Sequence, residues 1–470
     1  MIYGGKQMAN DEIQALALQY VNDGGDISKI IQELQNSLEE KPDLNQFHLK
    51  DHQGRIKGVY DDAIFRYILE KNQLFVLGGV VYHYDGGVYR PDISGAKLKT
   101  MIRKLIFPEF IKSTTIRRIY DLFISADELQ RTSDQVNQYP VTWICFRNGM
   151  YDPAARQMHI HSPSYYAMNQ LPHDFIPGDY PEGDSVERWL QFITPDPDDR
   201  EMLLQYVGYI MTRDTRQQKF LILTGEAGTG KSLLIKLIEK VIGYDNAVSI
   251  SLSELSQRFA AYGLLGKLLN SCADLEISAL EDVSVLKKAL GEDLLRAEKK
   301  GADAFPFKSY AKMLFSVNEL PIVKSERTMG FYRRLLVLTM NRKPEIQKPD
   351  LFDGLSDELD YFIHLAVDAV SRMYDSGMIL SSEHSIDAVE RLRRDSDSVE
   401  AFLYDQTDRS QEGRLERGYL HQQYASYCYA AERQPLTKSN FFKALRIKGI
   451  AEIKSNGAWY FTGLTMKTRG

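Results

Sequence analysis

The stretch FLILTGEAGTGKSLLIKLIEKVIG, residues 220–243, decides the fold expected of this chain. It opens with an apolar run typical of a buried β-strand, turns through a glycine-rich loop and continues with the apolar spacing of an amphipathic helix. The loop fits the pattern G-x-x-x-x-G-K-S. A strand before this pattern and a helix after it form the context in which it binds nucleotide phosphates.

Each residue type in this loop suits phosphate binding. Glycines let backbone N–H groups converge on an anion, and the helix that follows points its positive N-terminal end at it. We expect Lys231 to reach the β- and γ-phosphates and Ser232 to ligate Mg²⁺. The expected cofactors are ATP and Mg²⁺, although no base-reading motif indicates which nucleotide is preferred. The predicted binding residues are Gly225, Glu226, Ala227, Gly228, Thr229, Gly230, Lys231 and Ser232.

Length and composition indicate a globular protein of several domains. The 470 residues carry a net charge of −6, which excludes a wholly basic surface that coats nucleic acid. Basic residues instead concentrate in residues 286–301 and in residues 433–470, where eight Lys or Arg accompany one acid. The three cysteines lack metal-binding spacing. With no signal-peptide pattern and no apolar run of about 18 residues, we expect a cytoplasmic protein without a membrane partner.

Four apolar runs alternate with helical patterns: residues 219–225, 267–276, 311–321 and 333–340. This alternation predicts a mostly parallel sheet with helices on both faces, within an α/β multidomain chain. The predicted domains are a helical N-terminal segment (1–55), a β-rich α/β module (56–180), an ATPase core (181–345), a helical segment (346–395) and a winged-helix-like module of three helices and a short hairpin that binds DNA or a partner (396–470).

Polar residues end two of the predicted strands. Asp274, flanked by apolar Ala273 and Leu275, can hold Mg²⁺ through water or orient the attacking water, and Glu276 is a second candidate. The alternative for each acid is a solvated turn. Asn318 ends another buried strand, where it either positions the attacking water or simply forms the turn.

Arg333 and Arg334 open the last apolar run. An arginine at the start of a strand is commonly solvated or ion-paired. In ring-shaped ATPases the same position faces the nucleotide of a neighbouring subunit, where a positive charge stabilises the transition state. The two interpretations stay open for both arginines.

In this order and spacing, the elements resemble the superfamily 3 helicases, a branch of the AAA+ ATPases. More narrowly, they resemble the phage and plasmid primase–helicase family related to the poxvirus primase–helicase. GEAGTGKS is similar to that family's motif A, LLNSCADLE to its motif B, residues 286–321 to its B′ and C segments, and GFYRRLLVL to its arginine-finger segment. WICFRNGMYDP and the C-terminal tail also resemble family modules, so that the likeness covers roughly residues 60–470.

The resemblance implies roles for individual residues. Asp274 would be the Walker B acid, Asn318 the sensor, and Arg333 or Arg334 a finger that acts on a neighbouring subunit. Lys299 and Lys300, with Arg296 nearby, would lie at the hairpin that lines the pore of the ring and binds DNA; a solvated loop is the alternative. Relatives often carry paired acids where this chain has Ala273 before Asp274, which leaves the catalytic base open, with Glu276 as a stand-in.

The resemblance also implies an activity: an ATP-dependent DNA helicase that acts as a hexameric ring in replication of a phage, plasmid or mobile element. Its expected partners are single-stranded and forked DNA, further copies of the chain, and a separate primase, polymerase or loader in a bacterial cytoplasm. Only about 55 residues precede the β-rich module, so we expect no priming activity. The alternatives are an origin-binding initiator that melts DNA without translocating and, less favoured, a P-loop kinase or signalling NTPase.

Overall fold

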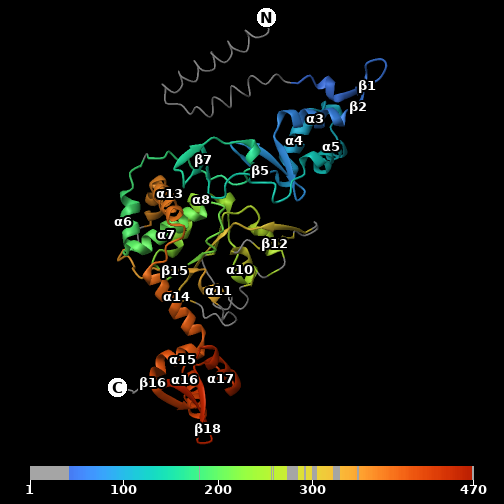
Figure 1. The fold of residues 1–470 in the computed structure, drawn as a ribbon. Coiled ribbons are helices and arrows are strands. Elements are labelled where there is room, and N and C mark those ends of the chain that lie inside the picture. The colour runs from blue at the N-terminus through green and yellow to red at the C-terminus, as the bar shows by residue number, and fades with distance from the viewer. Residues whose placement is uncertain are drawn as a thin grey trace. The chain divides into compact units, whose positions relative to one another are not determined.

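The structure is a computed structural model of the chain. It describes residues 42–178, 180–255, 257, 259–272, 284–290, 293–298, 304–320, 329–346 and 349–467. Two compact units divide the chain: an N-terminal unit of Met1–His83 and Pro91–Gln130, and a main unit of Tyr84–Arg90 and Arg131–Gly470 (Figure 1). Among the described residues, no helix combines the length and apolarity needed to cross a bilayer.

The N-terminal unit packs three helices around a small apolar core. Its helices are α3 (Asp61–Lys71), α4 (Ala96–Lys104) and α5 (Ser113–Ser125), and its strands include β1 (His48–Lys50), β2 (Ile56–Val59), β3 (Leu74–Leu77) and β4 (Val80–Asp85). The prediction of a helical segment over residues 1–55 is wrong for its last residues. Phe47 is buried in the core of this unit, and the next residues, His48–Lys50, form a strand that pairs with β2. Residues 1–41 lie outside the described part.

A five-stranded parallel sheet forms the centre of the main unit. The strands lie in the order β10 (Ala247–Val248), β11 (Leu269–Cys272), β14 (Lys312–Val317), β9 (Phe220–Thr224) and β15 (Leu335–Thr339), and every adjacent pair is parallel. All residues of β9 and β14 are buried, as expected of central strands in a parallel sheet, and β14 buries Lys312 and Ser316 together with its apolar side chains. The parallel sheet predicted from the sequence is therefore confirmed.

Helices cover both faces of this sheet. Leu221 and Leu223 of β9 pack into one core with α6 (Asp184–Ile193), α7 (Pro197–Ile210), α8 (Lys231–Ile242) and α13 (Leu359–Ser376). Phe220 and Ile222 point the other way, into a second core with α10 (Ser284–Leu290), α11 (Met329–Tyr332) and α14 (Glu383–Ser396). Successive side chains of β9 thus point into two separate cores, one on each face of the sheet, as expected when helices cover both faces.

Residues 131–180 belong to the main unit rather than to a separate module. Strands β6 (Ile144–Phe146), β7 (Gly149–Asp152) and β8 (Gln157–His159) form an antiparallel sheet. Ile144 and Phe146 are buried in the main core, so the predicted module of residues 56–180 is divided between the two units. The segment predicted to be helical from 346 to 395 contains α12 (Leu351–Asp357), α13 and most of α14.

The C-terminal residues build a module with a core of its own. Its elements are α15 (Ser398–Gln406), β16 (Thr407–Glu416), α16 (Arg417–Ala430), α17 (Lys438–Ile447), β17 (Glu452–Ser455) and β18 (Ala458–Met466). The strands form an antiparallel sheet in the order β16-β18-β17. The sequence led us to expect only three helices and a hairpin. Strand β16 was not predicted because its residues, TDRSQEGRLE, are almost all polar and for the most part exposed.

Candidate nucleotide site

The glycine-rich loop joins the end of β9 to the start of α8, as predicted. Gly225, Gly228 and Gly230 all have positive φ angles, of 144°, 85° and 96°. At Gly225 a Cβ atom would lie 2.1 Å from the carbonyl oxygen of Met340, the residue that follows β15. Glycine is therefore required both by the conformation of the loop and by the close approach of the chain after β15.

Lys231 lies inside this loop, with only 8% of its surface exposed. Its Nζ donates to the carbonyl oxygens of Gly225 and Glu226, the latter at 2.9 Å, while Thr229 Oγ1 donates to the Glu226 carbonyl at 3.0 Å. These bonds hold the ammonium group within the loop whose backbone we expect to surround a phosphate. Ser232 is exposed in the first turn of α8.

The neighbouring strand brings Asn318 to the same place. Strand β14 pairs with β9 so that Val317 lies beside Thr224, and Asn318 comes next in the chain. The Asn318 side-chain oxygen accepts a hydrogen bond from Lys231 Nζ at 3.4 Å. Strand β11, on the other side of β14, ends at Cys272, and both Asp274 and Glu276 lie outside the described residues.

The two predicted finger arginines differ in their surroundings. Arg334 is partly buried; its guanidinium donates to the Gly330 carbonyl at 2.6 Å and to Gln218 Oε1 at 2.9 Å. The Arg333 side chain is exposed, and its backbone carbonyl accepts a bond from Lys219 Nζ at 2.8 Å. Arg334 thus holds the chain at the start of β15, while Arg333 faces solvent.

The predicted DNA-contacting residues lie in or beside a β-hairpin. Strands β12 (Leu294–Ala297) and β13 (Phe305–Lys308) pair antiparallel, and Arg296 is exposed opposite Pro306. Lys299 and Lys300 fall in the segment that joins these strands and lie outside the described residues.

Sequence reasoning missed a lysine beside the loop. Lys343 Nζ lies 2.5 Å from Glu226 Oε2, and this contact lowers the pKa of the Glu226 carboxyl. The Met340 N–H donates to the Thr224 carbonyl at 2.7 Å. This bond keeps the chain that follows β15 next to the glycine-rich loop. No sequence motif indicates that Lys343 lies beside the loop, because its position depends on the path of the chain after β15.

Comparisons with known proteins find similarity over several parts of the chain. Residues 223–334 match the family described as "Family of unknown function (DUF5906)", and residues 29–195 match the family described as "D5 N terminal like". Over 162 residues, 33% of the chain, the sequence is 25% identical to "Putative helicase L207/L206" of Acanthamoeba polyphaga mimivirus. Two solved structures of the NrS-1 C-terminal region match with TM-scores of 0.51 and 0.52 at 14% identity, over 85% and 86% of this chain and 98% of each solved chain.

Over parts of its length the chain is therefore similar to helicase-like proteins of viral type. The match to the mimivirus relative spans 17% of that relative's length, and the NrS-1 structures share the fold. The segment matched over residues 223–334 contains Lys231, Asn318 and Arg333, so the candidate nucleotide site lies within a region shared with that family.

Within the described part of the chain, one group of side chains brings metal-ligating atoms together. These atoms of Asp196, Asp199 and His384 lie within 4.8 Å of one another. Asp196 accepts bonds from the first N–H groups of α7, and Asp199 accepts from Ser382 Oγ at 2.5 Å and pairs with His384 at 2.9 Å. The Asp199 pair raises the pKa of His384. These bonds connect the starts of α7 and α14, which is a sufficient structural role for the group.

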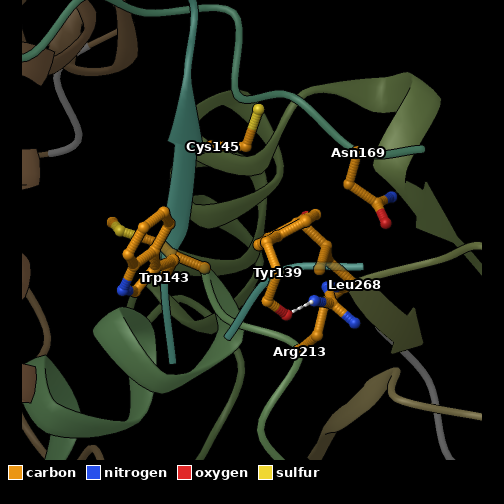
Figure 2. Close-up of a pocket in the computed structure, with 7 residues that line it drawn as sticks. Tyr139, Trp143, Cys145, Asn169, Arg213 and Leu268 are labelled. Atoms are coloured by element: carbon orange, nitrogen blue, oxygen red, sulfur yellow. Dashed lines mark hydrogen bonds between the residues drawn. The ribbon is translucent and has the colours of Figure 1, made fainter. Parts of the chain in front are cut away.

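A small pocket elsewhere in the main unit contains none of the predicted site residues. It is lined by Tyr139, Trp143, Cys145, Asn169, Met211, Arg213 and Leu268 (Figure 2). Arg213 donates to the Tyr139 carbonyl at 2.7 Å, and its guanidinium lies 4.1 Å from the centre of the Tyr139 ring. The charged side chain that lines this pocket is thus held against Tyr139.

Proposed function

We propose that this chain is an ATP-dependent DNA helicase of superfamily 3 that acts as a hexameric ring in replication of a phage, plasmid or mobile element. The contact between Lys231 and Asn318 carries the proposal. It joins a phosphate-binding lysine to a polar side chain at the end of the adjacent strand, where a γ-phosphate and its attacking water would meet. The sheet order β11-β14-β9, with one strand between the loop strand and the predicted acid strand, supports a AAA+ core.

The residues of the loop fit a nucleotide with its metal. Three glycines with positive φ leave room for phosphate oxygens, Lys231 supplies a buried positive charge, and the exposed Ser232 hydroxyl starts α8. Mg²⁺ would neutralise charge on the β- and γ-phosphates when bound. Ser232 and Asp274 would hold it, and Asp274 or Glu276 would accept a proton from the attacking water.

Register within the sheet supports a finger that acts between subunits. Leu335 of β15 pairs with Phe220 at the start of β9, whereas the loop follows Thr224 at its end. The start of β15 is therefore about 13 Å along the sheet from the loop of its own chain, at about 3.3 Å per residue. Arg333, exposed at that far edge, is suited to reach a neighbouring copy, and we assign the finger to it rather than to Arg334.

Translocation would depend on the β12–β13 hairpin. Its strands flank Lys299 and Lys300, and Arg296 is exposed on β12. Cations in the pore of a ring would contact the phosphates of single-stranded DNA. We propose a winged-helix fold for the C-terminal module from its order of helices and strands, with DNA or a replication partner as its ligand.

The decisive experiment is strand displacement on a forked DNA that contains no origin. We expect ATP-dependent unwinding by the intact chain, and loss of unwinding with retained DNA-independent ATP hydrolysis in the double variant Lys299→Ala/Lys300→Ala. Lys308→Ala, exposed at the other end of the same hairpin, is the matched control. Normal unwinding by the double variant would remove the pore assignment.

A second candidate function is an origin-binding initiator that uses ATP to assemble on DNA and melt it. The separate C-terminal module, with its own core and sheet, favours this alternative because it offers a second site for DNA. The same fork assay separates the two functions. An initiator without helicase activity would leave the origin-free fork intact while it hydrolyses ATP.

A further inference from the structure

Helix α17 of the C-terminal module presents a polar and basic face to solvent. Phe441, Phe442 and Leu445 are buried in the module's core. The helical period places a different set of side chains on the outer side, all of them exposed: Ser439, Asn440, Lys443, Arg446 and Ile447. The ten residues of the helix include no acid.

The β17–β18 hairpin extends this face. Lys454 pairs with Trp459 across the hairpin, and both side chains are exposed. Arg446 Nε of α17 lies 3.7 Å from Glu452 Oε1, at the start of β17. The helix and the hairpin are therefore adjacent parts of one surface.

Arg417 contacts both the helix α17 and the β17–β18 hairpin. Its guanidinium lies 4.2 Å from the ring centre of Phe442 and 5.6 Å from that of Trp459. Its Nε lies 3.8 Å from Glu452 Oε2. We call this surface the basic face and define it by Arg417, Ser439, Asn440, Lys443, Arg446, Lys454 and Trp459.

The charge of the basic face is strongly one-sided. The basic face carries four cations, and the acid Glu452 lies between two of them, Arg417 and Arg446. Lys448, by contrast, is paired with Asp397 and Glu400 at 2.7 and 2.5 Å, so this lysine serves the module's own structure. No hydrogen bond or ion pair of the Lys443 or Lys454 side chain is found within the described residues.

We infer that the basic face binds double-stranded DNA, with α17 in the major groove and the hairpin against the adjoining phosphates. A helix fits the major groove, which is about 12 Å wide, and Ser and Asn side chains can bond to base edges there. Lys443 and Lys454 are placed to neutralise phosphates. This inference deepens the proposed DNA or partner role of the module and does not depend on ATP.

Two other occupants fit the observations less well. Single-stranded DNA is bound by successive aromatic platforms, and the basic face has one aromatic side chain, Trp459. A protein partner would need an apolar centre, whereas the exposed large apolar side chains of α17 and the hairpin are Ile447, Ile453 and Trp459, and Ile453 alternates with Lys454 along β17. The predominance of cations and small polar groups favours a duplex.

The test measures equilibrium binding by the full chain without nucleotide. A labelled duplex of 30 base pairs and a labelled dT30 strand would be titrated at several salt concentrations by fluorescence anisotropy. The background is Lys299→Ala/Lys300→Ala, so that the proposed pore contributes nothing. We expect the duplex to bind at least about tenfold more tightly than dT30.

Adding Lys443→Ala and Lys454→Ala should weaken duplex binding about tenfold or more and reduce the slope of log K against log salt by about 2, one unit for each phosphate contact. Asn440→Ala should alter the preference among duplex sequences while leaving that slope unchanged. Arg409→Ala is the matched control, because Arg409 is an exposed cation on β16, the opposite edge of the same sheet.

The outcomes separate this inference from the helicase proposal. Unchanged duplex affinity and slope in the lysine variants, or tighter binding of dT30 than of duplex, would overturn the basic face as a duplex site. Lys231→Ala should abolish ATP hydrolysis and still bind duplex normally. If the ATPase assignment is wrong, the duplex-binding result is therefore unaffected. If the basic face does not bind duplex, the ATPase assignment is likewise unaffected.

Discussion

Asn318 Oδ1 lies 3.4 Å from Lys231 Nζ, although 87 residues separate the two in the sequence. The contact arises because β9 and β14 are adjacent and parallel, so that the residues after their last pair, Thr224 and Val317, come together at one edge of the sheet. In the proposed function, a γ-phosphate would bind beside both side chains.

Asn318→Ala should therefore impair hydrolysis more than binding. We expect ATP hydrolysis to fall about 100-fold, the usual effect of removing one preorganised polar group from a transition state, while nucleotide affinity changes only a few-fold. A fluorescent ATP analogue would report the affinity. Glu319→Ala, at the exposed next position, is the control and should retain full activity. Equal losses of affinity and turnover would show that Asn318 serves only to bind the nucleotide.

The loop and the central sheet could be predicted from the sequence because their signals are local. The apolar run of β9, the glycines and Lys231 follow one another directly, and β14 and β15 are equally plain apolar runs. The contact of Lys343 with Glu226 could not be predicted, because it depends on how the chain leaves β15. Strand β16 was missed for a different reason: an exposed edge strand lacks the apolar alternation that marks a strand.

Gly225→Ala should disrupt the loop. The new methyl group would lie 2.1 Å from the Met340 carbonyl oxygen, at a φ of 144° that is unfavourable for alanine. We expect a lower melting temperature and loss of binding of the ATP analogue. Gly354→Ala, in a helix where nothing lies within 4 Å of the new methyl group, should keep or slightly raise the melting temperature. Normal nucleotide binding by Gly225→Ala would show that the loop and the chain after β15 can separate at little cost.

Arg333→Ala and Arg334→Ala should have different effects, the first on ATP hydrolysis and the second on stability. Arg334→Ala removes bonds to Gly330 and Gln218 and should lower the free energy of unfolding by about 1–2 kcal/mol. Arg333→Ala should keep normal stability and nucleotide affinity but lose ATP hydrolysis by about three orders of magnitude.

Mixed assemblies test the action of Arg333 between subunits. Arg333→Ala and Lys231→Ala chains are each expected to be inactive alone. Mixed together, they should regain part of the ATPase activity, since some interfaces would combine an intact loop with an intact finger. Absence of any recovery in assemblies shown to contain both chains would contradict a finger supplied by the neighbour.

The Lys343–Glu226 pair should tune nucleotide affinity. Glu226→Gln removes a negative charge beside the loop and frees the lysine for a phosphate, so ATP should bind several-fold more tightly. Lys343→Gln should weaken binding by a similar factor. Titration of both variants with the ATP analogue at low and high salt would show effects that shrink as salt rises. Changes of the same sign in both variants would indicate that the pair acts by holding the loop rather than through charge.

Lys312 should make stability depend on pH. Its Nζ is buried at the start of β14, donates to the Thr212 carbonyl and lies 4.7 Å from the centre of the Tyr209 ring. Burial lowers its pKa to about 7; the nearby Asp214 opposes this shift and Arg213 adds to it. Between pH 7 and the ordinary lysine pKa of 10.5, the unfolded chain binds a proton that the folded chain has released. The contribution of Lys312 to the free energy of unfolding therefore rises with pH between 7 and 10.5, and it is lost as the pH falls through 7.

Urea unfolding at pH 7 and pH 9 would measure this effect against Lys312→Met. The substitution leaves the Thr212 carbonyl without its donor, a cost that is the same at both pH values. The free-energy advantage of the wild-type chain over the variant should therefore grow by about 2 kcal/mol between pH 7 and pH 9. Lys236→Met, at an exposed position of α8, should show no such growth. A pH-independent difference between the wild type and Lys312→Met would mean that the buried lysine keeps its charge, with the nearby Asp214 as its counter-ion.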